Sequence, residues 1–174
     1  MSLSVERVRH MAVLEVTKLG SAILRSKAQK VPKVTKRIVK LTKDMLETMY
    51  ATDGVGLAAP QIGENLRVIV VDPGDGPIAL INPEIVQAEG SETDVEGCLS
   101  LPGVLGYVER FSDIVVESLD EKGKSQRIQA SGLLARILQH EIDHLDGILF
   151  IDKATGISGL PELQAKLGLS EDQQ

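Results

Sequence analysis

The chain has 174 residues and a mass of 18.7 kDa, a length that suits one folded domain. Its 19 Lys and Arg residues against 25 Asp and Glu residues give a formal net charge of −6, which argues against a nucleic-acid backbone as the main partner. Two Tyr and two Phe are too few aromatic residues for a platform that stacks bases. The single cysteine, Cys98, excludes an internal disulfide. Hydrophobic residues make up 43% of the sequence, which excludes a disordered chain.

Membrane-spanning and targeting segments are not expected from the sequence. Purely apolar runs such as 68–71 and 148–151 hold four residues each, far short of the roughly 20 residues that cross a bilayer. The first ten residues carry charges and lack the apolar stretch of a signal peptide. We interpret residues 1–10 as a flexible extension of the domain.

Hydrophobic periodicity predicts the elements of the first half of the chain. Apolar residues at steps of three and four between 34 and 50 predict an amphipathic helix, with lysines on its other side and a turn at Pro32 before it. The runs 66–72 and 78–82 are typical of strands, and the Gly- and Pro-rich segment 73–77 between them is typical of a turn.

The second half predicts a hairpin and a short terminal helix. Residues 113–118 and 125–130 are expected to pair as strands, with Gly123 in the left-handed position of the turn between them. A last short helix is expected to start near Pro161, which suits the first helical position, and to end at Gly168.

A longer helix is predicted between these elements, at about residues 131–145. Ser131 can cap its first turn, and Gly147 can end it in the left-handed conformation. Its apolar stripe is too wide for one amphipathic face, so we expect the helix to be central and largely buried. The stripe consists of Leu133, Leu134, Ile137, Leu138, Ile142 and Leu145. Because strands outnumber helices and do not alternate with them, the predicted fold class is α+β, with antiparallel or mixed sheets packed around this helix.

The central helix carries the motif His140-Glu141-Ile142-Asp143-His144. A step of four residues rotates a helix by about 400°, so both imidazoles lie on one face and can bind the same metal ion. Glu141 lies beside them, where a carboxylate can act as general base on a water molecule that the metal activates. Two of the three histidines of the chain fall here among Leu and Ile, and a buried pair without partners would be costly. We therefore favour a metal site over two ordinary helix histidines.

A catalytic metal site of this kind needs a third protein ligand and an exchangeable position. One known class places a third His six residues after the second, but position 150 is Phe. A downstream glutamate could serve, and Glu162 has a suitable position. Cys98 is the other candidate, although most free cysteines are small buried hydrophobes. The residues by themselves leave Glu162 and Cys98 both open.

The segment 54–63, GVGLAAPQIG, formally matches the pattern G-x-G-x-x-A. A dinucleotide-binding loop follows a strand and opens a helix, whereas here a helix comes before the segment and Pro60 would interrupt a helix after it. We therefore reject a cofactor loop. The small residues instead allow another backbone to approach closely, and Gln61 offers an amide donor.

Three segments together resemble the signature motifs of the peptide deformylase family. They are GVGLAAPQIG (54–63), EGCLS (96–100) and QHEIDH (139–144), in that family's order and with similar separations. The likeness covers roughly residues 12–154. One HExxH match is a modest signal, but three motifs in register are very specific. The resemblance implies that Cys98, rather than Glu162, is the third metal ligand.

The activity that the resemblance implies is hydrolysis of the N-formyl group from the initiator methionine of nascent polypeptides. It implies a single catalytic domain, residues 1–174, with 155–174 as a variable C-terminal tail. One divalent metal ion is implied at Cys98, His140 and His144, usually Fe²⁺ in this family, with Zn²⁺, Ni²⁺ or Co²⁺ as alternatives in purified protein.

Other residues take roles from the resemblance, position by position. Glu141 is expected to take a proton from the attacking water and return it to the departing amine. Gln61 and the backbone N–H of Leu99 are expected to donate to the oxyanion. A methionine pocket is implied at Val55, Gly56, Leu133 and Ile137. The Glu96–Arg110 pair is expected to brace the cysteine loop.

The implied partners are N-formylmethionyl nascent peptides in a bacterial-type cytoplasm, without direct contact to nucleic acid or membrane. Some family members end in a basic helix thought to dock on the ribosome, which this chain lacks, so any transient ribosome association is expected to use another surface. Phe111 also departs from the family, which often carries Pro there.

Two other interpretations stay open from the residues. A metallopeptidase would use His140, His144 and Glu162. An interaction domain would hold a structural metal, and a fourth protein ligand would then close the site.

Overall fold

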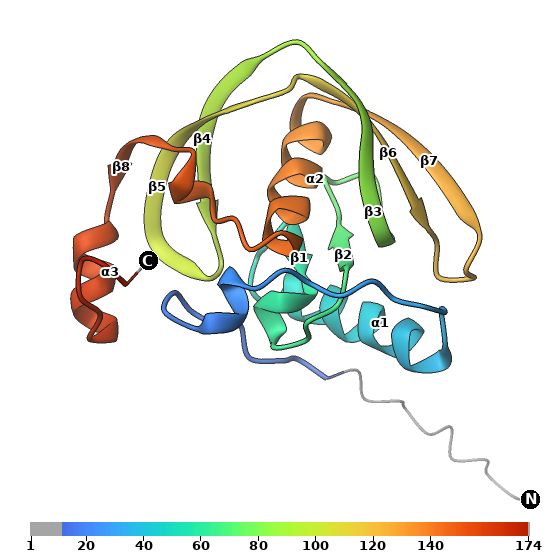
Figure 1. The fold of residues 1–174 in the computed structure, drawn as a ribbon, viewed down its shortest axis with the longest axis horizontal. Helices are drawn as coiled ribbons and strands as arrows, with labels where there is room; N and C mark the ends of the chain where they lie inside the picture. The colour runs from blue at the N-terminus through green and yellow to red at the C-terminus, as the bar shows by residue number, and fades with distance from the viewer. Residues whose placement is uncertain (1–11, 174) are drawn as a thin grey trace, which may run out of the picture.

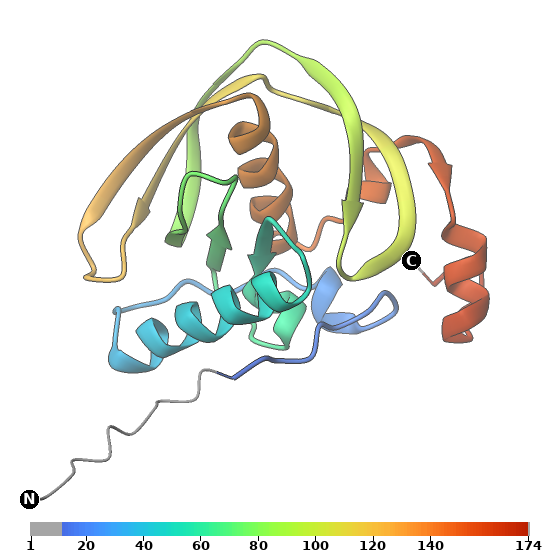
Figure 2. The ribbon, with the colours of Figure 1, turned by 180° about the vertical axis from the view of Figure 1, so that it is seen from behind.

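The computed structural model describes residues 12–173, so the extension expected at 1–10 lies outside the described residues. In the described part, two antiparallel sheets flank the central helix α2 (Gly132–Leu145), as Figure 1 shows. Helix α1 (Lys36–Ala51) runs across one end of the molecule, and α3 (Leu160–Leu167) lies at the outer side of the smaller sheet (Figures 1 and 2). The predicted α+β class, with sheets around a central helix, is confirmed.

The larger sheet has five strands in the order β1-β2-β3-β6-β7, and all its neighbours pair antiparallel. The strands are β1 (Gly56–Ala58), β2 (Val68–Val71), β3 (Ile78–Glu89), β6 (Asp113–Leu119) and β7 (Ser125–Ser131). Strand β2 is buried on both faces because alternate residues point to different helices. Ile69 and Val71 join the core around α2, whereas Val68 and Val70 join the core around α1.

The smaller sheet has the order β4-β5-β8, with β4 (Glu92–Cys98), β5 (Leu101–Arg110) and β8 (Thr155–Ser158). Its inner face packs on the 3₁₀ helix η3 (Phe150–Asp152) and on α3, in a second apolar core. Strand β4 is one edge of this sheet, and β1 is one edge of the larger sheet. Two unpaired strand edges therefore border the central helix.

The predicted helices and the hairpin are confirmed in their places. The helix expected at 34–50 is α1, the helix expected at 131–145 is α2, and the hairpin of β6 and β7 turns at Gly123 with φ 76°. Helix α3 has Pro161 in its first turn and ends at Gly168, which has φ 68°. Gly147, with φ 73°, follows the end of α2 as expected.

The prediction that the side chain of Ser131 caps α2 is wrong. Ser131 occupies the N-cap position, but its hydroxyl makes no capping bond and donates instead to Oδ1 of Asp113 at 2.7 Å. The first turn of the helix is thereby tied to β6, because a longer-range acceptor competes for the hydroxyl.

Strand boundaries differ most from the prediction. The strand expected at 66–72 is shorter, and the strand expected at 78–82 continues to Glu89. The β4–β5 hairpin was not expected, because β4 begins with the polar run Glu92-Thr93-Asp94 and carries no apolar alternation. The β4–β5 pairing itself defines these strands, with the register Glu92↔Arg110 to Glu96↔Gly106.

The C-terminal segment is folded onto the smaller sheet. Strand β8 pairs with β5, and Leu160 and Leu163 of α3 are buried in the second core. Within residues 12–173 there is no helix with the length and apolar character that a membrane span requires.

Candidate metal centre

Three donor atoms converge beside the C-terminal half of α2. His140 and His144 lie one turn apart on the helix, with ring centroids 5.0 Å apart, and Cys98 ends β4 opposite them. The ligand atoms of these three residues all lie within 4.8 Å of one another. Sγ of Cys98 is 3.4 Å from Nε2 of His144. The two histidines and the cysteine that the sequence predicts as ligands therefore come together.

The other predicted donor does not join them. In residues 12–173, the group of Cys98, His140 and His144 is the one cluster of three or more His, Cys, Asp or Glu donors with metal-binding spacing. Glu162 is exposed on α3, outside that cluster. The ligand set of the metallopeptidase interpretation is therefore not assembled, and no fourth donor from the described chain closes the site.

Glu96 holds His140 in place. Its Oε2 accepts a hydrogen bond from Nδ1 of His140 at 2.8 Å, which assigns the proton to Nδ1 and leaves Nε2 free as a ligand. The same carboxylate takes a two-pronged contact from Arg110, at 2.8 and 3.0 Å, and a bond from Arg136 at 2.9 Å. Burial disfavours the charge of Glu96, but His140 and Arg110 outweigh it and hold its pKa well below the usual range.

The charges around the cluster suit a bound cation. Burial opposes charge on His140, yet contacts with Cys98 and Glu96 outweigh it and raise the pKa of that imidazole. Positive charge is thus stabilised at this ring, and a bound cation would take the place of the Nε2 proton. Burial lowers the pKa of His144 well below its usual range, so this ring is the neutral form that coordinates metals. A thiol and two imidazoles form a donor set that Fe²⁺, Zn²⁺, Co²⁺ and Ni²⁺ accept, so the residues fit a divalent metal.

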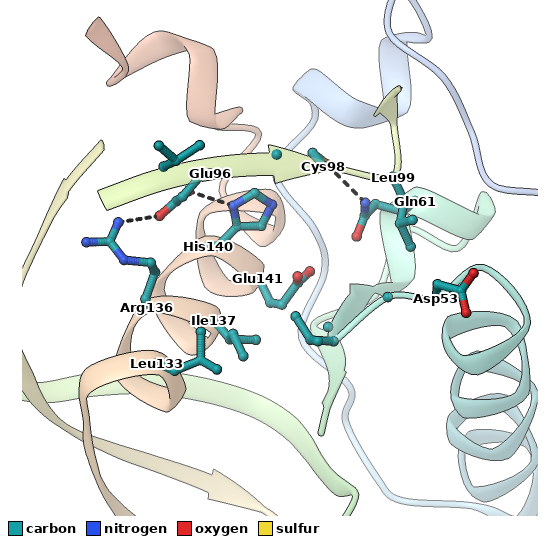
Figure 3. Close-up of a pocket in the computed structure, with 15 residues that line it drawn as sticks. Asp53, Gln61, Glu96, Cys98, Leu99, Leu133, Arg136, Ile137, His140 and Glu141 are labelled. Carbon is teal, nitrogen blue, oxygen red and sulfur yellow. Dashed lines mark hydrogen bonds and ion pairs between the residues drawn. The ribbon is translucent and has the colours of Figure 1, made fainter. Parts of the chain in front are cut away.

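Glu141 faces a pocket that Cys98 and His140 also line (Figure 3). Its Oε2 is buried and has no hydrogen-bond partner among the described residues, and burial raises the pKa of Glu141 to about 7. Gly56 lies against it: a Cβ at Gly56 would stand 2.6 Å from Oε1 of Glu141 and 2.9 Å from Cγ2 of Ile137. The absence of a side chain at Gly56 thus lets the side chains of Glu141 and Ile137 approach the backbone of the glycine-rich segment.

The pocket has a volume of about 300 Å³ and lies between β1, β4 and α2. The four residues expected to form a methionine pocket, Val55, Gly56, Leu133 and Ile137, all line it. Ile137 is 5% exposed, whereas Val55 and Leu133 are about half exposed, at 49% and 57%. Ile137 thus lies deep, and the other two side chains form an apolar rim.

Gln61 is a buried, oriented amide rather than a surface side chain. It is 1% exposed on the 3₁₀ helix η2 (Ala59–Ile62). Its Oε1 accepts from the backbone N–H of Ala58 at 2.9 Å, and its Nε2 donates to Oγ of Ser100 at 3.2 Å and lies 3.4 Å from Sγ of Cys98. Its donor end therefore points at the metal centre.

Ser100 and Arg136 were not predicted from the sequence. Ser100 lies in the motif segment 96–100 but has no charge or periodicity to single it out. Arg136 did carry a signal: a guanidinium on a helix expected to be buried needs an anionic partner. That partner is Glu96, and Arg136 also donates to the carbonyls of Val108 and Glu92, both at 2.8 Å.

Phe111, where the family often carries Pro, makes two backbone hydrogen bonds to Gln139. Its backbone N–H donates to Oε1 of Gln139 at 3.0 Å, and its carbonyl accepts from Nε2 of Gln139 at 2.9 Å. A proline has no N–H for the first bond. The position therefore gains a second tie between the end of β5 and the helix that carries the histidines.

A Cys-His-His donor set, a free carboxylate on the same helix and an apolar pocket define a metal-dependent hydrolase. The sequence profile of the polypeptide deformylase family matches residues 13–158. The chain belongs to this family, which is metal-dependent.

Relatives support the assignment along most of the chain. A peptide deformylase of Pelotomaculum thermopropionicum is 57% identical over 150 residues, which cover 86% of this chain and 97% of that protein. The crystal structure of a peptide deformylase from Synechococcus elongatus in complex with actinonin is 42% identical and has a TM-score of 0.84, covering 92% of this chain and 90% of that one. The enzyme from Thermotoga maritima, at 41% identity, has a TM-score of 0.81 over 84% of this chain and 99% of that chain.

The Glu96 network predicts a large loss of stability in Glu96→Gln. Arg110 and Arg136 would keep buried charges without their carboxylate, and breaking such a pair costs about 3–5 kcal/mol. Glu117→Gln is the control, because the Glu117–Arg127 pair is about half exposed and should cost less than about 1 kcal/mol. Urea unfolding measures both. Equal losses in the two variants would contradict the central place of Glu96.

Proposed function

We propose that the chain hydrolyses the formamide bond of N-formylmethionyl peptides, with Cys98, His140 and His144 holding one divalent metal ion. The convergence of these three donors beside the Glu141 carboxylate carries the proposal. The metal would act as a Lewis acid that polarises the formyl group and makes water acidic. We propose Fe²⁺ as the native ion; because equilibrium affinity favours Zn²⁺ over Fe²⁺, metal supply decides occupancy.

Glu141 is the proposed general base and acid. Its buried Oε2 lacks a competing hydrogen bond and borders the pocket, so it can accept a proton from the water that attacks the formyl carbon. When the C–N bond breaks, the same carboxyl group gives the proton to the amine nitrogen. The products are formate and a peptide with a free amino terminus.

Gln61 and Leu99 are the proposed donors to the oxyanion. Nε2 of Gln61 lies 3.4 Å from Sγ of Cys98, and Leu99, the next residue in the chain, also lines the pocket. Both donors are fixed before substrate arrives, which is the arrangement that stabilises a developing negative charge at low cost.

The substrate peptide is proposed to lie between the two unpaired strand edges. Gly56 of β1 and Gly97 of β4 both line the pocket, and each strand is an edge of its sheet. An extended peptide can then add backbone hydrogen bonds to either edge. Its methionine side chain would enter the apolar cavity at Val55, Leu133 and Ile137.

We propose a bacterial cytoplasmic setting, where formylated nascent peptides arise. The three relatives described for the metal centre come from bacteria. The described C-terminal segment carries Lys166 against Glu162, Glu171 and Asp172, so it offers no basic helix for a ribosome.

The pocket predicts selection for an apolar first residue. Formyl-Glu-Ala-Ser should be hydrolysed with a kcat/KM at least about 100-fold below that of formyl-Met-Ala-Ser, because its carboxylate would be buried without a partner. Formyl-norleucine-Ala-Ser, which has nearly the shape of the methionine substrate, should stay within about 3-fold. Formate release measures all three. Comparable rates for the glutamate peptide would place the side chain elsewhere.

Glu141→Gln should keep its metal and lose turnover, because an amide cannot accept the proton. General acid–base catalysis contributes about 10²–10⁴-fold, which sets the expected fall in kcat. Metal content and formate release are measured on the same preparation. Near-normal turnover with a full metal complement would refute the proposed role of Glu141.

Cys98→Ser should lose most of its metal, because a serine hydroxyl is not deprotonated at neutral pH as a coordinated thiol is. Glu162→Gln, on the exposed face of α3, should retain both metal and activity. Metal analysis is made on protein whose circular dichroism shows it folded. A metal-replete Cys98→Ser enzyme that still releases formate would overturn the ligand assignment.

A further inference from the structure

Leu99 and Ser100 form the tight turn between β4 and β5. The last paired residues of this hairpin are Cys98 and Leu101, so the carbonyls of the two turn residues have no partner in the ladder. Both find one in the N-terminal segment. The backbone N–H of Leu19 donates to the Ser100 carbonyl at 3.0 Å, and Nζ of Lys18 donates to the Leu99 carbonyl at 3.1 Å.

The same segment also holds the other proposed donor. The backbone N–H of Thr17 donates to the carbonyl of Gln61 at 2.6 Å. Residues 17–19, here called the clamp segment, therefore contact the backbone of both donor loops within three residues. In Figures 1 and 2 the N-terminal segment passes beside the β4–β5 turn in both views. Leu19 is 4% exposed and anchors the clamp segment in the second core, with Leu101.

Lys18 differs from its neighbours because its contact is made by a side chain. It is exposed, and its ammonium forms no ion pair within residues 12–173. A long side chain loses conformational entropy when it is held in one place. Its bond to the Leu99 carbonyl, a charge-assisted hydrogen bond, opposes that cost.

We propose that the clamp segment positions the two oxyanion donors, and that Lys18 is a positioning residue for the N–H of Leu99. This rests on the proposed function of Gln61 and Leu99. Lys18 and Leu19 fix the two peptide planes that come after Leu99, and Cys98 fixes the chain before it, so the direction of the Leu99 N–H has little freedom. Because the oxyanion forms only in the transition state, a loosened donor lowers kcat rather than substrate binding.

The test compares Lys18→Met, Lys18→Arg and Lys27→Met in the metal-loaded enzyme. Lys27 is the matched control, since it is an exposed lysine without an ion pair among the described residues. Removing a whole oxyanion donor costs about 10²–10³-fold, so a loosened one should lower kcat by about 3- to 10-fold in Lys18→Met, with KM within 2-fold. Lys18→Arg, which keeps the charge and the reach, should recover most of the kcat. Lys27→Met should match the unmutated chain, and all melting temperatures should agree within about 2 °C.

Three outcomes would overturn the proposal. One is a kcat in Lys18→Met equal to that of Lys27→Met. Another is a raised KM at unchanged kcat, which would mean that Lys18 serves ground-state binding. The third is a fall in melting temperature that parallels the fall in kcat without rescue by arginine, which would mean a purely structural role. Gln61→Ala tests the proposed function separately from the role of Lys18. If this variant retains full activity, the oxyanion roles themselves fail, whatever the result at Lys18.

Discussion

The buried carboxylate of Glu96 is the interaction on which the rest of the site depends. It joins β4 to β5 through Arg110 and to α2 through Arg136 and His140, so one side chain ties the β4–β5 hairpin to helix residues that lie 40 or more positions after Glu96 in the chain. His140 and Arg110 keep it ionised, and an ionised carboxylate can only accept hydrogen bonds. It therefore fixes both the rotation and the tautomer of His140. Asp143, on the same helix, accepts a third hydrogen bond of Arg110 at 2.5 Å and extends the network away from the pocket.

Around this carboxylate the chain brings together pieces that cannot hold a site separately. The helix supplies two imidazoles and a carboxylate, the end of β4 supplies the thiol, and the segment after α1 supplies the glycine edge and the amide of Gln61. The edge strands β1 and β4 both line the pocket beside the helix, so the same geometry that completes the metal centre leaves backbone groups free for an extended ligand. The burial of α2 between the two sheets therefore both assembles the metal ligands and forms the pocket proposed for an extended ligand.

The sequence predicted the elements that have strong periodicity and the residues that have distinctive chemistry. The 3.6-residue pattern located α1 and α2, and the spacing of His140 and His144 placed them on one face. Cys98 was one of two open candidates until three motifs were considered together. The β4–β5 hairpin escaped prediction because pairing, and not side-chain alternation, defines it. The contacts of Ser100 and of the clamp segment escaped for a related reason: all of them involve a backbone group or a small hydroxyl whose partner is set only by the tertiary fold.

The contact of Gly56 with Glu141 and Ile137 has a consequence for how the enzyme could acquire new substrates. At that point the backbone of Gly56 faces the side chains of Glu141 and Ile137, and a Cβ at Gly56 would clash with both. One wall of the cavity is therefore main chain, so no substitution at Gly56 can widen it. Evolution or an engineer can reshape the entrance, at Val55 and Leu133, whose exposed side chains have room to vary. New specificities in this scaffold should then arise from substitutions at the pocket entrance, while the wall at Gly56 stays as it is.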